Sequence, residues 1–563
     1  MNLTITKKPS FLLALVLCIS SLLYELKAQE NTFEDVRIRA FSGVQPLGNN
    51  GYYFSSFSGK NETKGENDFR LTFLDNDLNV KKEKILSLSK YSDLAGSAAT
   101  DNHVLFVFYD YSKRNVTYMT FDAEGNTIAT REISKVKRRL LTSENFPYVF
   151  PQGDNFVVVK AEKEDKVGYN IEMVDKDLKS LNSLTFAPEK KEMEILDIKM
   201  LDDKLYVLRQ TAPKSGKTFS NEVVKHDAKT GVEDYVYSLY DGTHSGYPTF
   251  VRVNEGGNLY TGGMYFEGTK TSNTDSEGFF YLQLDNSGKS VAYEKHDWGE
   301  VKKFFKEKGT SAVWGGKTKI IVQDIVLRPD NSLAVIGEAF RKSKPGKAGD
   351  GKKAFGMPKA GLGSIAASAS GVKGPNWAYT LMDLNIFEFD AEGNFVNARK
   401  IFKPDQVVYV KSEKKVRGLS MAMELKRNGY FGYKYSIEEG EKQYLVTRMI
   451  AEKGKLITIP KKSVHFIPLE AFGIEESGSV DVRSPTVREK KKGFANAVVG
   501  AVSAITAYDE TLYDTTDDST DSFYYNYDNL NGSVYHNGEL LFFNYNVLDA
   551  TLRVWKDKIP VKG

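Results

Sequence analysis

The 563-residue sequence predicts an all-β protein that is built from a repeated unit of short antiparallel strands. Aromatic residues make up 12% of the chain, with 34 Phe and 31 Tyr, and such flat rings favour the pleated faces of strands. The hexapeptide FDAEGN occurs twice, at Phe121–Asn126 and at Phe389–Asn394, each time between two apolar runs. A turn that recurs between similar strands indicates a repeat architecture.

The FDAEGN turn is predicted to join two strands of a β-hairpin. Gly125 and Gly393 can adopt the positive φ that a tight turn requires, and Asp122 and Asp390 can accept hydrogen bonds from nearby backbone amides. Degenerate copies of this turn follow other alternating apolar runs, at residues 73–79, 173–179, 225–231, 283–289 and 449–455.

A second hairpin signature lies upstream, where turn-forming residues precede an aromatic and β-branched run. It occurs at residues 47–57, 100–109, 151–161, 201–210, 254–266, 328–340, 426–436 and 536–546. Two hairpins supply four strands in roughly 45–60 residues, which is the unit size of a propeller blade. Because one such sheet cannot bury both of its faces, we expect the blades to stack around an axis.

The two ends of the chain are predicted to close the ring. The last unit has one clear strand after its hairpin, at residues 550–557, and lacks a fourth, whereas the alternating segment 33–41 (FEDVRIRAF) is spare. We expect this segment to complete the last blade and to remove two exposed sheet edges. The predicted fold is an all-β β-propeller of eight four-stranded blades with helical and loop insertions. Seven blades are the main alternative, and an array of β-sandwiches is another.

Residues 1–28 are predicted to be a signal peptide. Lys7 and Lys8 precede the apolar stretch Phe11–Leu23, which is too short to span a bilayer comfortably, and Ala28 marks the expected cleavage point. A retained anchor helix is the alternative.

The mature chain, residues 29–563, is predicted to be a single exported propeller domain, periplasmic or extracellular. The only cysteine, Cys18, lies inside the signal, and the bulky Val16 and Leu17 before it argue against lipidation. The mature chain therefore has no disulfide and no Cys-ligated metal site. The formal charge of +3 is near balance and argues against nucleic acid as a partner. No later apolar stretch is long enough for a transmembrane span.

Two interruptions of the repeat lie in the middle of the chain. Glu300–Lys308 is predicted to form a short amphipathic helix between blades. Residues 341–376 form a Gly-, Ala- and Ser-rich insertion with eight basic residues and one acid, which is typical of a surface loop. A binding loop with a small-residue helix around 362–369 is the alternative interpretation.

A third interruption is predicted at residues 461–521. Its apolar part, residues 493–508, is expected to be a small-residue helix that covers one mouth of the propeller channel or packs on an outer face. The acidic tract 509–521 follows. Its carboxylates would suit calcium, but it lacks the spacing and the glycine of a known calcium loop, so a solvated loop is the default. We expect this tract to lie near the basic insertion and to pair with it.

The sequence names no catalytic residue, no metal ligand and no cofactor, and the ligand-binding residues are unknown. It contains no GxSxG turn, no P-loop and no GxGxxG after a strand. None of the six histidines has metal-ligand spacing; they are His103, His226, His244, His296, His465 and His536. We expect exposed or edge positions for His103, His226 and His536. His244, in the Gly-rich DGTHSGYPTF, is the most suggestive because this connection could reach the channel.

Two local patterns and the overall repeat resemble known propellers. KHDAKTG (225–231) resembles the turn of quinone-dependent propeller repeats, but the tryptophan of those repeats is missing, which argues against quinone binding. EGGNLY (255–260) resembles a kelch-type double glycine and occurs once. Taken over residues 30–557, the strand–turn–strand units and the KAQE signal end resemble uncharacterised exported β-propeller proteins of the Bacteroidota. That resemblance implies a cell-envelope or secreted location and no particular ligand.

These observations favour an exported, non-catalytic binding or scaffold protein of the cell envelope, with an unknown protein or glycan as its partner. A rigid repeat body with irregular insertions suits binding through one mouth of the ring. The alternative is a hydrolase or lyase that acts on glycans or peptides through two carboxylates in the central channel.

Overall fold

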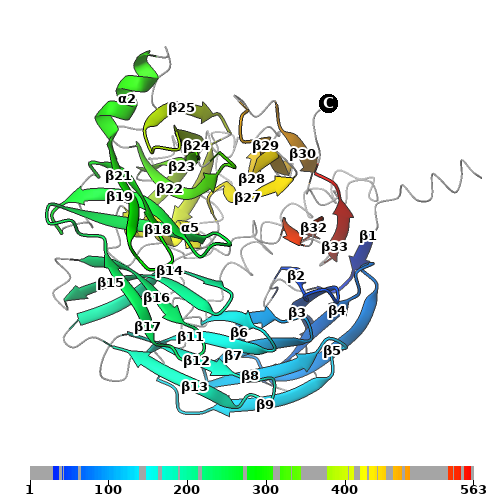
Figure 1. Ribbon diagram of the computed structural model, residues 1–563. Coiled ribbons are helices and arrows are strands. Elements are labelled where there is room, and N and C mark those ends of the chain that lie inside the picture. The colour runs from blue at the N-terminus through cyan, green and yellow to red at the C-terminus, as the bar shows by residue number, and fades with distance from the viewer. Residues whose placement is uncertain are drawn as a thin grey trace, which may run out of the picture.

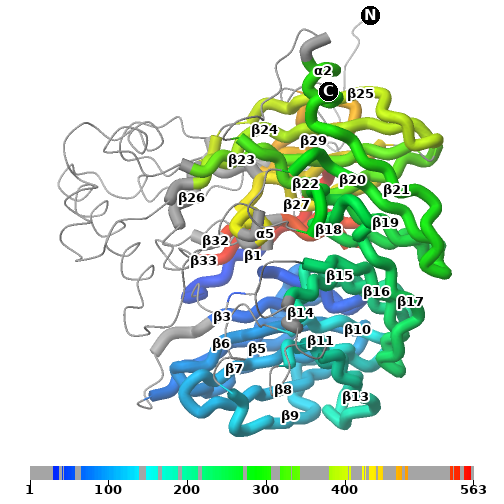
Figure 2. Tube along the Cα trace, turned by 90° about the vertical axis from the view of Figure 1, so that its left-hand side faces the viewer, coloured from blue at the N-terminus to red at the C-terminus, as the bar shows by residue number. Residues whose placement is uncertain are grey.

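The computed structural model describes residues 30–36, 41, 43–60, 65–137, 147–162, 168–187, 191–213, 219–269, 276–307, 318–330, 332–343, 377–403, 405–410, 419–427, 430–439, 442–451, 461–471, 476–481, 531–536, 538–546 and 551–559. In these segments the strands form eight antiparallel sheets, which are arranged around a ring (Figure 1). Figure 2 shows the first blades (blue to cyan) in the lower half and the later blades (green to yellow) in the upper half. The prediction of an eight-bladed β-propeller is confirmed, and the seven-bladed and β-sandwich alternatives are wrong.

Each blade runs from an inner strand through a second and a third strand to an outer strand. Blade 1 consists of β2 (Gln45–Pro46), β3 (Tyr52–Lys60), β4 (Glu66–Leu74) and β5 (Val80–Ser89), and blade 2 of β6 (Ser92–Ala99), β7 (His103–Asp110), β8 (Asn115–Asp122) and β9 (Thr127–Ile133). Blade 3 consists of β10 (Tyr148–Gln152), β11 (Asn155–Glu162), β12 (Gly168–Val174) and β13 (Ser180–Phe186), and blade 4 of β14 (Lys191–Leu201), β15 (Lys204–Pro213), β16 (Ser220–Asp227) and β17 (Glu233–Ser238).

Blades 5–8 follow the same order, with two helices between them and one additional strand. Blade 5 consists of β18 (His244–Val253), β19 (Leu259–Glu267), β20 (Gly278–Leu284) and β21 (Ser290–Asp297), and helix α2 (Trp298–Glu307) follows it. Blade 6 consists of β22 (Thr318–Leu327), β23 (Leu333–Ser343), β24 (Trp377–Phe389) and β25 (Phe395–Ile401), with the additional strand β26 (Gln406–Val410) beside β24, and helix α5 (Leu419–Arg427) follows it. Blade 7 consists of β27 (Tyr433–Glu439), β28 (Lys442–Ala451), β29 (Lys461–Pro468) and β30 (Gly478–Asp481), and blade 8 of β31 (Asn531–His536), β32 (Glu539–Asn546), β33 (Thr551–Asp557) and β1 (Glu30–Phe33).

The burial of each strand follows its place in the blade. The second strand β7 is a continuous apolar run that is buried along most of its length, because blades cover both of its faces. The outer strand β17 alternates between half-buried and exposed residues, because one of its faces meets water. This is why the sequence shows continuous apolar runs for the middle strands and alternation for the outer ones.

The core consists of apolar clusters between neighbouring blades. Phe69 of blade 1 packs edge-to-face on Phe108 of blade 2, with ring centroids 4.8 Å apart. Phe54 of blade 1 and Val554 of blade 8 belong to another cluster, which joins the last blade to the first. Each buried Phe or Val stabilises the fold by roughly 1.5–3 kcal/mol relative to an exposed position. The clusters therefore hold the ring closed as well as its individual sheets.

The ring is closed by the N-terminal strand. β1 pairs with β33 and becomes the outer strand of blade 8, and Glu30 forms an ion pair with Arg553. This strand differs from the predicted one: it comprises Glu30–Phe33, so it overlaps the predicted segment 33–41 only at Phe33. The residues of β1 before Phe33 are charged or polar, so they lack the apolar alternation by which the segment 33–41 was chosen. That alternation therefore did not identify the residues that pair with β33.

The repeated FDAEGN turn has the predicted conformation in both copies. Gly125 and Gly393 have φ values of +76° and +85°. The carboxylate of Asp122 accepts a hydrogen bond from the amide of Asn126 at 2.7 Å, and Asp390 accepts one from Asn394 at the same distance. Both turns lie between the third and outer strands of their blades.

The third-to-outer turns of several blades also contact the preceding blade. Arg131, in the outer strand of blade 2, donates a hydrogen bond of 3.0 Å to the carbonyl oxygen of Leu178, in the turn of blade 3. Asn182 of blade 3 donates one of the same length to the carbonyl oxygen of Lys229, in the turn of blade 4. We call this contact between a third-to-outer turn and the preceding blade a turn contact. It explains why the turn is repeated: it is an inter-blade joint.

The ring has two distinct faces. Because the strands of a blade are antiparallel, the second-to-third connection and the connection to the next blade leave from the same end of the sheet. We call this end the insertion face, and the opposite end, which carries the third-to-outer turns, the turn face. Residues 344–376 join β23 to β24, and residues 482–530 join β30 to β31, so both segments are attached at the insertion face.

The boundaries of the predicted insertions change accordingly. Arg341 to Ser343 belong to β23, so the insertion predicted at 341–376 starts after Ser343. The insertion predicted at 461–521 contains two strands of blade 7, β29 and β30, and begins only after Asp481. The remaining parts of both predictions lie outside the described residues, including the helices expected at 362–369 and 493–508 and the acidic tract 509–521. The helix expected at 300–308 is present as α2.

Candidate functional site

The inner strands of several blades share a β-bulge, in which one extra residue interrupts the ladder with the second strand. The extra residues are Ala95, Leu196, Thr249, Gln323 and Lys434, in blades 2, 4, 5, 6 and 7. A bulge bends its strand and leaves the extra residue outside the regular pairing. Backbone and side-chain polar groups of the inner strands are therefore available for contacts between blades.

Two aspartates follow the bulge at equivalent positions. Asp197 comes after Leu196 in blade 4, and Asp324 comes after Gln323 in blade 6. Each carboxylate accepts a hydrogen bond from the amide of the next residue, at 2.9 Å for Asp197 and 2.8 Å for Asp324. The second oxygen of Asp197 accepts a 2.8 Å bond from the amide of Val251 in blade 5. The aspartates therefore tie neighbouring inner strands together.

Asp324 is the centre of a network that spans three blades. Tyr433 of blade 7 donates its hydroxyl to Asp324 at 2.5 Å, and Arg252 of blade 5 lies 3.3 Å from the same carboxylate oxygen. Arg252 also donates to the hydroxyl oxygen of Ser436 in blade 7, at 2.8 Å. Because Arg252 reaches a blade two places away, this network lies near the centre of the ring. We call this network, together with Asp197 and the lysine described next, the hub.

Helix α5 brings a lysine to this hub, inside the ring beside β18 and β22 (Figure 1). Lys426 donates hydrogen bonds to the carbonyl oxygens of two bulge residues, Thr249 at 2.7 Å and Gln323 at 2.8 Å. Met421 and Leu425 of the same helix are buried in the largest apolar cluster. The helix is thus fixed by apolar packing along its length and by an ammonium group near its end.

Burial changes the protonation of two of these groups. Desolvation lowers the pKa of Lys426 to about 8, although the charges of Asp197 and Asp324 oppose that shift. Desolvation, together with the charge of Asp324, raises the pKa of Tyr433 well above its usual value. Near neutral pH, Tyr433 is therefore a hydroxyl donor and Lys426 is mostly charged.

A buried ion pair lies next to the hub. Glu338 of β23 is fully buried, and its carboxylate lies 2.9 Å from the ammonium of Lys403, whose side chain is 3% exposed. Glu338 also accepts hydrogen bonds from the amides of Gly432 at 3.0 Å and Tyr433 at 3.2 Å. Glu338 therefore joins blade 6 to the start of blade 7.

The carboxylates of this arrangement contact groups of other blades. A glycosidase needs two carboxylates that face a substrate, one of them as an acid and the other as a nucleophile or base. Asp197, Asp324 and Glu338 each accept at least one hydrogen bond from a neighbouring blade. Within the described segments, no three His, Cys, Asp or Glu side chains gather as a possible metal site.

The histidines do not assemble into a site, since they are distributed over five blades. His226, expected at an exposed or edge position, is fully buried: it lies 2.9 Å from the hydroxyl of Tyr169 and 3.1 Å from the carbonyl oxygen of Gly231. That expectation is wrong, because the turn after β16 places the carbonyl oxygen of Gly231 against the imidazole of His226. Burial lowers the pKa of His226 to about 4. His103 and His536 are half-buried, and His536 contacts the carbonyl oxygen of Gly48 at 2.7 Å.

His244 lies at the start of the inner strand β18, five residues and roughly 16 Å along the strand from Thr249. Its Nδ1 lies 3.2 Å from the ammonium of Lys295. Lys295 in turn pairs with Asp241. His244 therefore lies apart from Lys426 and the hub, in a small polar group of blade 5.

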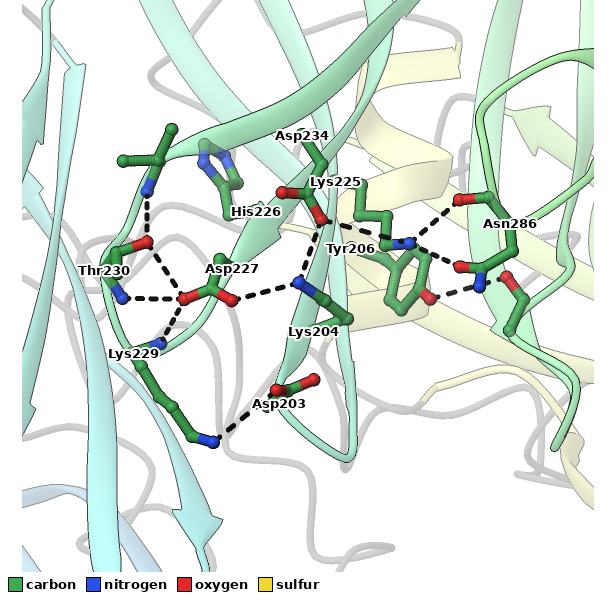
Figure 3. A network of polar contacts seen from close by, with 12 residues as sticks. Asp203, Lys204, Tyr206, Lys225, His226, Asp227, Lys229, Thr230, Asp234 and Asn286 are labelled. Atoms are coloured by element: carbon green, nitrogen blue, oxygen red, sulfur yellow. Dashed lines mark hydrogen bonds and ion pairs between the residues drawn. The ribbon is translucent and has the colours of Figure 1, made fainter.

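A further polar cluster surrounds the KHDAKTG turn of blade 4 (Figure 3). Lys204 lies 3.0 Å from Asp227 and 3.1 Å from Asp234, and Lys225 donates to the carbonyl oxygen of Asn286 in blade 5 at 2.9 Å. Asn286 belongs to the third-to-outer turn of blade 5. The cluster is therefore the turn contact between blades 4 and 5, with its charges paired inside the protein.

Sequence reasoning missed every residue of the hub. Asp197, Arg252 and Asp324 come from three different blades and Lys426 comes from helix α5, and no spacing in the chain links them. One weak signal exists in the sequence: LDI at 196–198 and QDI at 323–325 place an aspartate in otherwise apolar inner strands. A carboxylate in an otherwise apolar strand requires partners, but the sequence does not identify them.

The comparisons with known proteins assign no activity. A sequence model of a family of unknown function, DUF6770, matches residues 9–449. No curated protein matches the chain.

Solved structures that are similar to this chain include three of low identity. The polysaccharide lyase Uly1 is 10% identical, with a TM-score of 0.38 over 83% of this chain and 90% of the lyase. The WD40 domain of SCAP from fission yeast is 10% identical, with a TM-score of 0.35 over 94% and 98%. The β-propeller domain of the Trilobed protease from Pyrococcus furiosus is 8% identical, with a TM-score of 0.33 over 82% and 100%.

Proposed function

Because the chain belongs to the DUF6770 family, whose function is unknown, we propose a function from its geometry. We propose that it is an exported, non-catalytic binding or scaffold protein of the cell envelope, whose partner is a protein or a glycan. The partner binds at the insertion face.

The asymmetry of the two faces carries this proposal. The turn face carries the inner-to-second and third-to-outer connections, and third-to-outer turns there make turn contacts with the preceding blade. The insertion face has the two long segments, 344–376 and 482–530, and the connection that leads into α5. A rigid ring that places all of its long connections on one side is the arrangement expected of a binding scaffold.

The charge of these segments supports the same face. The region 341–376 carries eight basic residues and one acid, and the tract 509–521 carries six acids and no base. The strands that flank both segments end at the same face, as our pairing hypothesis for the basic insertion and the acidic tract requires. That pairing is still a prediction.

The hub supports a non-catalytic role over the hydrolase or lyase alternative. The hub carboxylates Asp197 and Asp324, and Glu338 next to the hub, are hydrogen-bond acceptors that hold blades together. A substrate would have to displace those contacts before any of the three carboxylates could act as an acid, a base or a nucleophile. The alternative therefore predicts turnover that depends on Asp324, whereas our proposal predicts only a loss of stability in Asp324→Asn.

Export is supported by the sequence at the N-terminus. The basic pair and the apolar stretch Phe11–Leu23 precede Ala28, and the clasp strand β1 begins two residues later, at Glu30. None of the described helices is long and apolar enough to cross a membrane. N-terminal sequencing of the protein from the envelope fraction tests the cleavage point, and Gln29 is the expected first residue.

The test of the binding function is a pull-down from envelope extract with residues 29–563 as bait. In one variant, residues 344–376 are replaced by a four-residue turn, which suits the register because Ser343 pairs with Ala378. In a second variant, a flexible linker replaces residues 482–530. The matched control carries Lys176→Glu and Lys229→Glu, two exposed changes on the turn face.

We expect one partner to be retained by the full chain and by the control, and to be lost from at least one deletion variant. A partner that is lost only from the turn-face control would contradict the proposal. Hydrolysis of envelope glycan or peptide by the full chain, abolished in Asp324→Asn without loss of folding, would establish the enzyme alternative instead.

A further inference from the structure

The ammonium group of Lys426 occupies a site that two blades build together. It donates to the carbonyl oxygens of Thr249 in blade 5 and Gln323 in blade 6, at 2.7 and 2.8 Å. The ring of Phe250 lies 5.6 Å from the nitrogen, within the range of a cation–π contact. The carboxylates of Asp197 and Asp324 favour the charged state of this lysine. Two backbone oxygens and an aromatic ring thus contact one primary ammonium, and the charges of two carboxylates favour its protonated state.

The two carbonyl oxygens belong to the fold of the inner strands and not to the helix. Thr249 and Gln323 are the extra residues of their bulges, so the ladder between the inner and second strands does not fix them. The bulges recur in other blades, where no lysine from α5 reaches. Asp197 and Asp324 are likewise held by the amides that follow them. The acceptors are therefore supplied by the blades and not by the helix that carries Lys426.

We propose that the inner strands of blades 5 and 6 form a binding site for a primary alkylammonium group, which Lys426 of α5 occupies from within the chain. A primary ammonium matches this site because it offers three N–H donors on a compact charge. The inference goes beyond the proposed function because it names a ligand class, and it holds whether or not the protein is exported.

The test removes the resident group and supplies it from solution. Lys426→Ala deletes three side-chain carbons and the nitrogen, and n-propylammonium contains the same atoms. The readouts are the melting temperature of residues 29–563 and the calorimetric binding of n-propylammonium at neutral pH. The comparison solutes are 1-propanol, which is neutral, and tetramethylammonium, which has the charge but no N–H.

We expect Lys426→Ala to melt below the wild type and n-propylammonium, at millimolar concentrations, to recover part of the loss. Neither comparison solute should do so. The wild type should bind no n-propylammonium at this site, because Lys426 fills it. The matched control is Lys426→Met, whose side chain refills most of the space without the charge and should gain nothing from the amine.

Three results would overturn the proposal: no recovery of Lys426→Ala by n-propylammonium, equal recovery by tetramethylammonium, or equal recovery of Lys426→Met. If Lys426→Ala accumulates only as unfolded chain, its refolding yield with n-propylammonium and with 1-propanol becomes the measurement. An equal yield in both solutes would then refute the site.

Discussion

The side-chain amide of Asn31 donates a hydrogen bond of 2.6 Å to the carbonyl oxygen of Leu78. Asn31 lies in β1, the outer strand of blade 8, and Leu78 lies in the third-to-outer turn of blade 1. Arg131 and Leu178 form the equivalent contact between blades 2 and 3. The joint that closes the ring is thus built like the joints inside it.

Asn31→Ala should destabilise the ring by about 1 kcal/mol, because it leaves the Leu78 carbonyl oxygen without this donor. The measurement is the urea midpoint of residues 29–563. Asn76→Ala is the control: Asn76 donates to the carbonyl oxygen of Asn49 from an exposed position, where water can replace it. A smaller midpoint shift for Asn31→Ala than for Asn76→Ala would show that the turn contact does not stabilise the closure.

Gly125→Ala should destabilise the protein more than Gly538→Ala does. Both glycines have nearly the same positive φ, +76° and +78°, so the backbone strain of an alanine is matched. An added Cβ at Gly125 would lie 2.8 Å from the buried ring of Phe73 in blade 1, whereas nothing lies within 4 Å at Gly538. Overpacking of this kind costs about 1–3 kcal/mol. Equal unfolding midpoints for the two variants would show that the turn does not press on the preceding blade.

His296→Phe should remove part of the acid sensitivity of the fold. Burial lowers the pKa of His296 to about 4, so the unfolded chain binds a proton between about pH 6.5 and pH 4 and the folded protein does not. Stability therefore falls as the pH falls through this window, by about 2 kcal/mol at pH 5 for this one residue. The free energy of unfolding of His296→Phe should lose that much less between pH 7 and pH 5 than the wild type.

His296→Gln provides the control for this prediction. Glutamine does not titrate, so its pH dependence should match that of His296→Phe, even though it places a polar group among Phe279 and Phe389. If either variant retains the wild-type pH dependence, His296 is not the residue responsible.

Lys403→Met should cost about 3–5 kcal/mol, because it leaves the carboxylate of Glu338 buried without its cation. Glu338→Gln should be costly as well, since Glu338 also accepts from two amides of blade 7. The double variant should be more stable than the sum of the single losses predicts. Urea unfolding of all four proteins gives the coupling energy, and additive losses would show that the pair is not coupled.

The sequence was sufficient for the architecture because the outer hairpins repeat a local signal. Asp122 and Gly125 define a turn whose geometry depends on neighbouring residues alone, and the same holds at Asp390 and Gly393. The same reliance on local signals led to a wrong strand assignment in blade 7. The stretch 426–436 combines a turn signal with an aromatic run, but it spans the end of α5 and the first residues of β27. The strands of this blade were therefore displaced by one, and β29 and β30 were counted as insertion.

The hub could not be derived in this way. Arg252 and Ser436 are 184 residues apart, and Lys426 and Thr249 are 177 residues apart. Their proximity depends on how the inner strands are arranged around the axis and on where each bulge falls, and both are properties of the assembled ring. A lone aspartate in an apolar strand signals a buried acceptor but does not identify its donors.

The clasp of β1 on β33 has a consequence for the order of events during synthesis. Glu30 leaves the ribosome 523 residues before its partner Arg553. At roughly 5–20 residues per second, the interval is about half a minute to two minutes. Each earlier blade can dock on its predecessor as it appears, but throughout that interval the first blade lacks the neighbour to which Asn31 belongs, and the N-terminal strand has no sheet to join. The newborn chain is thus an open arc, and the period before closure is when it is most exposed to pairing with another chain.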